Sequence, residues 1–175
     1  PEVDFFWTGP KVCSTEYPES HIQEVSERLG RKPFIWDNYP VNDSERRSKH
    51  LYLSAYENRP HKLSDYTSGH AVNPMNQAWC SQIPFWTLAE SYRAKAGYDP
   101  RTSLVSAAQD LCGDELSRAL LSDLHNFEER GLDELTEKEK NDLVEKYQGF
   151  HSPLAVEIVD WLNGEYVFDP ACLTD

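Results

Sequence analysis

Two short apolar segments separated by one amphipathic helix restrict the fold more than any other feature of this sequence. Residues 3–7 read VDFFW and end at Thr8-Gly9-Pro10, and residues 34–36 read FIW. Between them, residues 20–29 repeat apolar side chains at helical spacing. A strand, a helix and a strand within about 35 residues form a βαβ unit, whose strands are parallel. Their continuous apolar character predicts a sheet covered on both faces.

The two ends of the predicted helix have separate signals. Ser20 followed by Gln23 matches a capping box, so we expect Ser20 to be the N-cap. Gly30 stands where a left-handed residue commonly ends a helix. Pro33 prevents the helix from continuing into the second strand.

The remaining sequence changes from short strands to helices. Residues 44–68 are polar and irregular and predict a long loop with a short helix, and Ala71-Val72 predicts a third strand. Helices are then expected over 78–97, from Asp99-Pro100 to Gly113, from Asp114 to 127, from a Thr136–Glu139 capping box to 147, and from Ser152-Pro153 to 164. Three strands cannot close a core alone, so the pattern indicates the end of a larger α/β domain followed by a helical domain.

The charge balance excludes two classes of partner. The chain has 17 basic and 30 acidic residues, which give a formal net charge of −13. Nucleic acids and anionic membranes bind basic surfaces, so neither is an expected partner. The sequence also contains no apolar run long enough to cross a membrane.

The cysteines and histidines show no metal-ligand spacing. Cys13, Cys80, Cys112 and Cys172 lie far apart without a CxxC pair, so we expect no metal site and no cofactor. Such cysteines are typical of reduced thiols in an intracellular protein, which favours a cytoplasmic location. The sequence begins at Pro1 rather than Met, so we expect that an N-terminal segment, with any signal peptide, is missing.

Polar residues follow each of the three predicted strands. They are Thr8-Gly9, residues 38–43 and residues 73–76. In parallel α/β folds the ligand lies at the carboxyl ends of the strands, so these residues are expected to share one site. Asp and Asn side chains suit sugar hydroxyls, and a Trp can form a wall against a sugar face.

Each candidate residue also has a structural interpretation. Trp36 is at a position where most proteins place a core residue, and Asp37 can cap local backbone. Asp43 can belong to an Asx turn, and Asn73 before Pro74 can be a turn former. Composition alone leaves these alternatives open.

Three motifs together resemble a known enzyme family. FFWTGPKVCS at residues 5–14, LGRKPFIWDNYPVND at 29–43 and AVNPMNQ at 71–77 resemble, in order and spacing, glycoside hydrolase family 84. This family contains O-GlcNAcases and bacterial β-N-acetylglucosaminidases, formerly described as hyaluronidases. The resemblance covers roughly residues 3–113, and the helical tail is only generally similar.

The resemblance implies a particular fold. Family members have a (β/α)8 TIM barrel, and the three strands of this chain match its last three. Residues 1–97 would then be the C-terminal part of the barrel, and residues 98–175 the all-α helical domain. The N-terminal part of the same enzyme would be the structural partner of this chain.

The resemblance also implies a reaction and a set of site residues. Family members remove terminal GlcNAc by substrate-assisted catalysis through an oxazoline, using a pair of adjacent Asp residues on an earlier strand. No Asp-Asp pair occurs in the 175 residues, so no catalytic residue is expected here. The resemblance assigns the sugar pocket to Trp36 as the wall near the acetamido group, Asn38 beside the catalytic carboxylates, and Asp43 and Asn73 as partners of the sugar hydroxyls.

Three hypotheses follow for the activity. The first is the C-terminal part of a retaining β-N-acetylglucosaminidase, inactive alone, which acts on a GlcNAc-bearing protein or glycan. The second is a non-catalytic GlcNAc-binding or interaction module. The third is hyaluronan cleavage on the same barrel.

Overall fold

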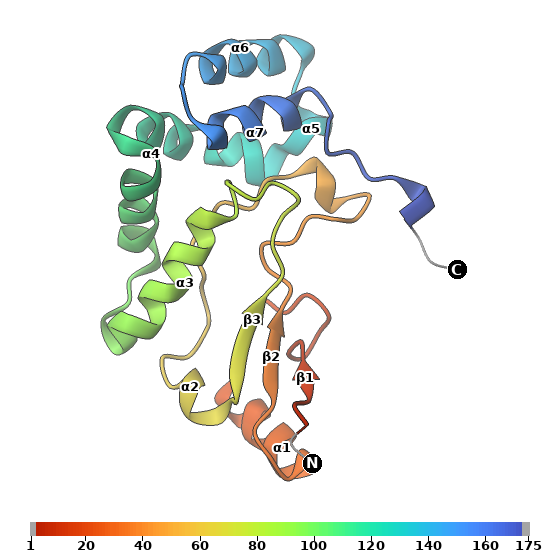
Figure 1. Cartoon of the computed structure of the whole chain (residues 1–175), viewed down its shortest axis with the longest axis vertical. Coiled ribbons are helices and arrows are strands. Elements are labelled where there is room, and N and C mark those ends of the chain that lie inside the picture. Colours follow the sequence, from red (N-terminus) through yellow and green to blue (C-terminus); the bar gives the residue numbers. More distant parts are fainter. Residues whose placement is uncertain (1–2, 173–175) are drawn as a thin grey trace.

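The computed structural model describes residues 3–172 and contains one small parallel sheet (Figure 1). Its strands are β1 (Phe6–Trp7), β2 (Phe34–Asp37) and β3 (Gly69–Val72), in that order across the sheet. Both pairings are parallel, with Phe6 opposite Phe34 and Trp36 opposite Ala71. This confirms the predicted βαβ unit and the third strand. The first strand is shorter than the predicted residues 3–7, and the third begins two residues earlier than Ala71.

Helices account for most of the remaining chain. The helices that follow β3 lie beside this strand or beyond one end of the sheet (Figure 1). The helices are α1 (Glu19–Leu29), α2 (Leu63–Tyr66), α3 (Gln82–Ala94), α4 (Pro100–His125), α5 (Gly131–Glu134), α6 (Glu137–Gln148) and α7 (Pro153–Leu162). A π-helical segment, Asn126–Arg130, joins α4 to α5. The predicted helix end at Gly113 is confirmed, because this residue is non-helical, with φ 70° and ψ 177°, and α4 consists of two helices on either side of a kink there.

Most of the predicted helix ends are confirmed. Gly30 is left-handed, with φ 65°. The Asp99 carboxylate accepts a hydrogen bond from the Thr102 backbone N–H at 2.7 Å, and Thr136 forms the expected capping box. The capping box at Ser20 is wrong. Helix α1 starts at Glu19, two residues before the start that an N-cap at Ser20 predicts, and its cap, Pro18, makes no side-chain hydrogen bond.

The two faces of the sheet differ in how they are covered. On one face Ile35 packs with Tyr17 of the loop before α1, Ile22 of α1 and Leu63 of α2. On the other face the Phe6 ring lies against Phe34 and Trp36, with centroid distances of 5.1 and 5.6 Å. Phe6 is 64% exposed and Trp36 38% exposed. The prediction that both faces are covered is therefore wrong for the described residues 3–172.

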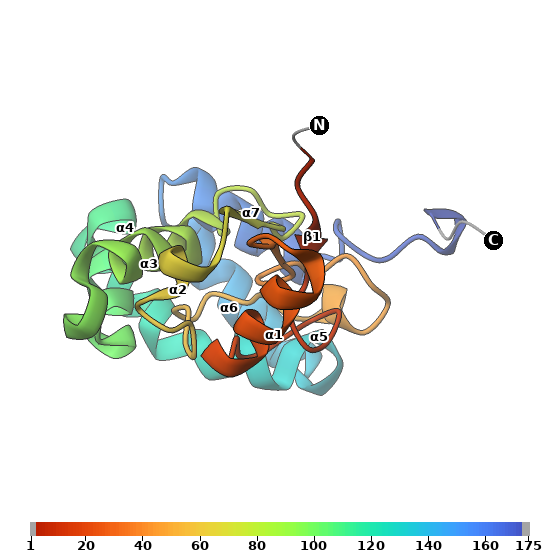
Figure 2. The same cartoon turned by 90° about the horizontal axis from the view of Figure 1, so that it is seen from below.

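A second, larger core joins the long loop to the helices. It contains Leu51, Leu53 and Met75 together with side chains of α3 to α7 and the π-helical segment. Trp161 of α7 donates from its indole N–H to the Ser48 carbonyl at 3.0 Å. After α7, Tyr166 still packs against this core, and the chain then extends away from it (Figures 1 and 2). The division into domains at residue 97 stays a prediction.

Other whole-chain expectations concern membranes and thiols. Among the described residues, no helix has the length and apolar character needed to cross a membrane. Cys13, Cys80 and Cys112 carry free thiols, and the Cys172 side chain lies outside the description.

Gly131, at the start of α5, lies where this helix closely approaches Lys49 and His50 of the long loop. Its backbone has φ 63° and ψ −175°, a region that only glycine adopts readily. An added Cβ would lie 2.6 Å from the Lys49 carbonyl oxygen. Gly131→Ala should therefore lower the free energy of unfolding by about 3 kcal/mol or more, from strain and the clash together.

Gly30→Ala is the matched control, because Gly30 is also left-handed but a Cβ there would meet nothing within 4 Å. This variant should cost only about 1–2 kcal/mol. Thermal unfolding of both variants measures the difference. Equal losses at the two positions would contradict the close approach.

Candidate functional site

Three of the four candidate residues meet at the carboxyl ends of β2 and β3. The Asn38 side-chain oxygen accepts from the Trp36 indole N–H at 3.0 Å and from the Asn73 side-chain amide at 3.1 Å. The parallel pairing of Trp36 with Ala71 places these ends side by side. Asn73 is therefore more than a turn former, and Trp36 is not a core residue of the described chain.

The remaining bond of Asn38 fixes the orientation of its amide group. Its NH₂ donates to the Val12 carbonyl oxygen at 2.8 Å. Val12 lies in the loop after β1, so the ends of all three strands contribute to this cluster. We call Trp36, Asn38 and Asn73 the strand-end cluster. Trp36 and Asn38 present one indole face and one fixed amide on the open side of the sheet.

Asp43 lies apart from the strand-end cluster. Its side chain is exposed and makes no hydrogen bond with the described residues. It borders a cavity of about 590 Å³ together with Asn76 and Phe168. The Asx turn proposed for Asp43 is not formed, and the neighbouring Asn42 instead binds the Asn76 backbone N–H at 3.0 Å. A binding role for Asp43 stays a prediction.

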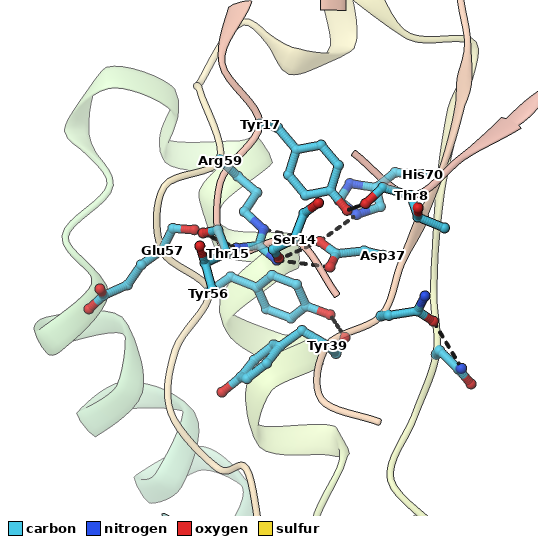
Figure 3. A network of polar contacts seen from close by, with 12 residues as sticks. Thr8, Ser14, Thr15, Tyr17, Asp37, Tyr39, Tyr56, Glu57, Arg59 and His70 are labelled. Atoms are coloured by element: carbon cyan, nitrogen blue, oxygen red, sulfur yellow. Dashed lines mark hydrogen bonds and ion pairs between the residues drawn. The ribbon is translucent and has the colours of Figure 1, made fainter. Parts of the chain in front are cut away.

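Asp37, the residue between Trp36 and Asn38, belongs to a buried ion pair with Arg59 (Figure 3). Asp37 is fully buried, and its carboxylate accepts from the Arg59 guanidinium at 2.8 to 3.0 Å. His70 lies 3.3 Å from the same carboxylate through Nε2, and its Nδ1 lies 2.7 Å from the Tyr92 hydroxyl. Asp37 thus has a structural role, but it pairs with distant side chains and does not cap the local backbone as the sequence suggested.

Aromatic rings enclose the Arg59 guanidinium. It lies 5.2 Å from the Tyr17 ring centroid and 5.1 Å from that of Tyr56. Burial, followed by the nearby Asp37 charge, raises the pKa of both phenols and raises the pKa of Tyr92 to about 12. These phenols therefore stay neutral around Asp37 at neutral pH. Nothing in the sequence pattern identifies Arg59, because it lies in the irregular loop.

A half-buried carboxylate, Glu128, connects the helices to the long loop. Glu128 accepts from the Leu53 backbone N–H at 2.6 Å and from the backbone N–H and hydroxyl of Ser54. It lines a cavity of about 340 Å³ that also contacts Asn38 and Arg59. Burial raises the pKa of Glu128, although the hydrogen bonds oppose this effect.

The raised pKa leads to a prediction about pH. The folded protein binds the Glu128 proton more tightly than the unfolded chain does, so its stabilising effect is complete at low pH. That effect is lost as the pH rises through the folded pKa. Glu128→Gln keeps an acceptor for the backbone N–H groups and cannot ionise. The stability of this variant relative to wild type should therefore rise as the pH increases above about 4.5.

Urea unfolding at several pH values measures this difference. Glu145→Gln is the control, since Glu145 is an exposed glutamate on α6 and is not among the charges that shift the pKa of Glu128. A Glu128→Gln profile parallel to wild type at every pH would show that Glu128 titrates normally.

The described residues show no grouping suited to a metal ion. No three His, Cys, Asp or Glu side chains within residues 3–172 lie together as a possible metal site. The strand-end cluster itself offers hydrogen bonding through its amides and aromatic contact through the Trp36 indole. Amides and one indole face can bind a neutral polar ligand.

Comparison with known proteins gives one family and several relatives. A family described as beta-N-acetylglucosaminidase matches residues 1–125. The chain is 37% identical over 94 residues to proteins named Protein O-GlcNAcase from Rattus norvegicus and Mus musculus, a match to 54% of this chain and 10% of each relative. The chain thus matches a small part of these curated relatives.

Solved structures show the same relationship. An O-GlcNAc hydrolase variant from Thermobaculum terrenum superposes with a TM-score of 0.70 and 30% identity, over 93% of this chain and 41% of that one. A structure titled CpGH84B has a TM-score of 0.69 and 20% identity, over 92% of this chain and 34% of that one. The second likeness shows the fold alone.

Proposed function

Because the chain belongs to the β-N-acetylglucosaminidase family, glycoside hydrolase family 84, we propose that it supplies part of the sugar pocket of an enzyme that removes terminal GlcNAc. The substrate is a protein or glycan that bears this sugar. The observation that carries the proposal is the strand-end cluster, in which Trp36, Asn38 and Asn73 are hydrogen-bonded at the carboxyl ends of two parallel strands.

The open edges of the sheet support a larger barrel. Among the described residues, β1 and β3 each pair only with β2, so their outer edges carry no partner strand. The last three strands of an eight-stranded barrel need partners at those two edges, the fifth strand and the first. The exposed Phe6 and Trp36 would then face the barrel interior. The partner for both edges is the N-terminal part of the same enzyme.

In this proposal the chain binds the sugar and the upstream part cleaves it. Trp36 packs against the acetamido group, and Asn38 and Asn73 present fixed amides to the sugar. Asp43 accepts hydrogen bonds from its outer hydroxyls. The acetamido oxygen attacks the anomeric carbon to form an oxazoline, one of the exceptions to the two-carboxylate scheme. The adjacent Asp pair that polarises this group and protonates the leaving oxygen belongs to the upstream part.

Hydrolysis of two chromogenic substrates tests the proposal. The full-length protein should hydrolyse 4-nitrophenyl N-acetyl-β-glucosaminide and leave 4-nitrophenyl β-glucoside intact, because the glucoside lacks the attacking acetamido group. Residues 1–175 alone should hydrolyse neither.

Other results would point to other functions. Binding of GlcNAc by the full-length protein without hydrolysis would indicate a sugar-binding module. Preferred cleavage of hyaluronan over a GlcNAc-bearing peptide would indicate the related chemistry on the same barrel. The cytoplasmic location stays a prediction that fractionation of the source cells can check.

A further inference from the structure

We propose that Arg59 is a positioning residue of the sugar pocket, which holds the β2 end and the loop after β1 so that Asn38 points at the sugar. Arg59 itself does not touch the strand-end cluster. This inference rests on the proposed function, because the cluster is taken to bind GlcNAc. Two connections from Arg59 to Asn38 carry it.

The first connection runs through the chain next to Asn38. The Asp37 carboxylate is held by the Arg59 guanidinium, and Asp37 directly precedes Asn38. The Tyr56 ring that stacks on Arg59 donates its hydroxyl to the Tyr39 carbonyl, on the other side of Asn38. Arg59 therefore fixes the backbone on both sides of the residue that forms the centre of the cluster.

The second connection runs through the loop after β1. Arg59 donates to the Thr15 carbonyl at 3.0 Å and to the Ser14 carbonyl at 3.5 Å. The Ser14 hydroxyl in turn accepts from the Lys11 backbone N–H at 3.0 Å and donates to the Lys11 carbonyl at 2.9 Å. Val12, which follows Lys11 in the chain, provides the carbonyl that accepts a hydrogen bond from the Asn38 amide. The Arg59 guanidinium thus holds both the backbone that bears the Asn38 side chain and the loop that contains its hydrogen-bond acceptor, the Val12 carbonyl.

Only arginine has the donors for this arrangement. Five N–H groups on a planar fork serve one carboxylate and several carbonyls, while the flat faces lie against Tyr17 and Tyr56. The fork also donates to the Glu57 carbonyl at 2.8 Å. A lysine keeps the positive charge for Asp37 but has three donors and no flat face. Arg59→Lys therefore preserves the charge balance and releases the loop.

A double-mutant cycle distinguishes positioning from general support of the fold. In the full-length enzyme, Arg59→Lys should lower kcat/KM for 4-nitrophenyl N-acetyl-β-glucosaminide on the order of tenfold. In an Asn38→Ala background, Arg59→Lys should change kcat/KM less than about twofold, because the Asn38 amide that Arg59 positions is already removed. Equal losses in both backgrounds, or no loss in the wild-type background, would overturn the inference.

A matched control and an alternative variant complete the design. Arg28→Lys changes an exposed arginine that is paired with Glu24 on α1, and should leave kcat/KM unchanged. If Arg59→Lys does not fold, Ser14→Ala interrupts the second connection and leaves the Asp37–Arg59 pair intact. The same cycle is then measured with Ser14→Ala, with the same criterion.

A measurement without sugar separates this inference from the proposed function. Hydrogen exchange of the full-length protein should become about tenfold faster over residues 9–17 in Arg59→Lys and stay unchanged over α1. If the wild type neither binds nor hydrolyses GlcNAc, the proposed function fails, and the exchange then decides only whether Arg59 holds the loop after β1. Unchanged exchange over 9–17 would overturn the inference.

Discussion

Replacing Asp43 with alanine is expected to lower kcat/KM of the full-length enzyme for 4-nitrophenyl N-acetyl-β-glucosaminide by roughly 10- to 150-fold. In the proposed pocket this carboxylate accepts hydrogen bonds from the outer hydroxyls of the sugar. Charge-assisted hydrogen bonds of this kind are worth about 1.5–3 kcal/mol, and each 1.4 kcal/mol is a factor of about ten. Steady-state hydrolysis of the chromogenic substrate measures the loss.

Asp65→Ala is the control for this prediction. Asp65 is an exposed carboxylate on α2 and does not line the cavity that Asp43 borders. Because Asp43 is exposed and free of hydrogen bonds to the described residues, its removal should leave the melting temperature unchanged. Unaffected hydrolysis by Asp43→Ala, or an equal loss in Asp65→Ala, would show that Asp43 does not bind the sugar.

The second large effect concerns stability. Arg59→Met should lower the free energy of unfolding by about 3–5 kcal/mol, because it leaves the fully buried Asp37 carboxylate without its partner. In a domain of about 150–250 residues such a loss lowers the melting temperature by roughly 6–20 °C, and the shift is smaller in the larger full-length protein. Thermal unfolding of the full-length protein, followed by circular dichroism, measures it.

Two further variants assign this loss to the buried pair. Arg93→Met removes an arginine that is 71% exposed and paired with Glu90, and it should shift the melting temperature by only about 1–2 °C. Adding Asp37→Asn to Arg59→Met removes the unpaired charge and should recover part of the loss. A similar melting temperature for the Arg59 and Arg93 variants would contradict the importance of the pair.

Most of the helices and strands that the sequence predicts correctly are marked by local sequence signals. Gly30 and Asp99 mark helix ends through backbone conformation and side-chain capping, which depend on few neighbours. The predicted capping box at Ser20 failed because Ser20 lies inside the helix, at its second residue. The helix starts at Glu19, directly after Pro18. The prediction that both faces of the sheet are covered failed because an apolar strand pattern does not say which side chains of the described residues cover each face, and Phe6 and Trp36 remain exposed.

The candidate site was predicted in part for a similar reason. Trp36, Asn38 and Asn73 each follow or end a strand, and parallel pairing brings strand ends together. Asp43 lies five residues beyond Asn38, where the loop path decides its position and strand patterns carry no information. Arg59 was missed because an arginine in an irregular loop has no pattern that marks it as buried.

A crystal structure of the full-length protein with a GlcNAc-derived inhibitor tests the central claim most directly. The account predicts the acetamido group against the Trp36 indole, and the sugar hydroxyls within hydrogen-bond distance of Asp43 and Asn73. It also predicts an adjacent Asp pair from the upstream part beside the anomeric carbon. A sugar bound elsewhere, with the strand-end cluster free of contact, would contradict the assignment of this chain to the pocket.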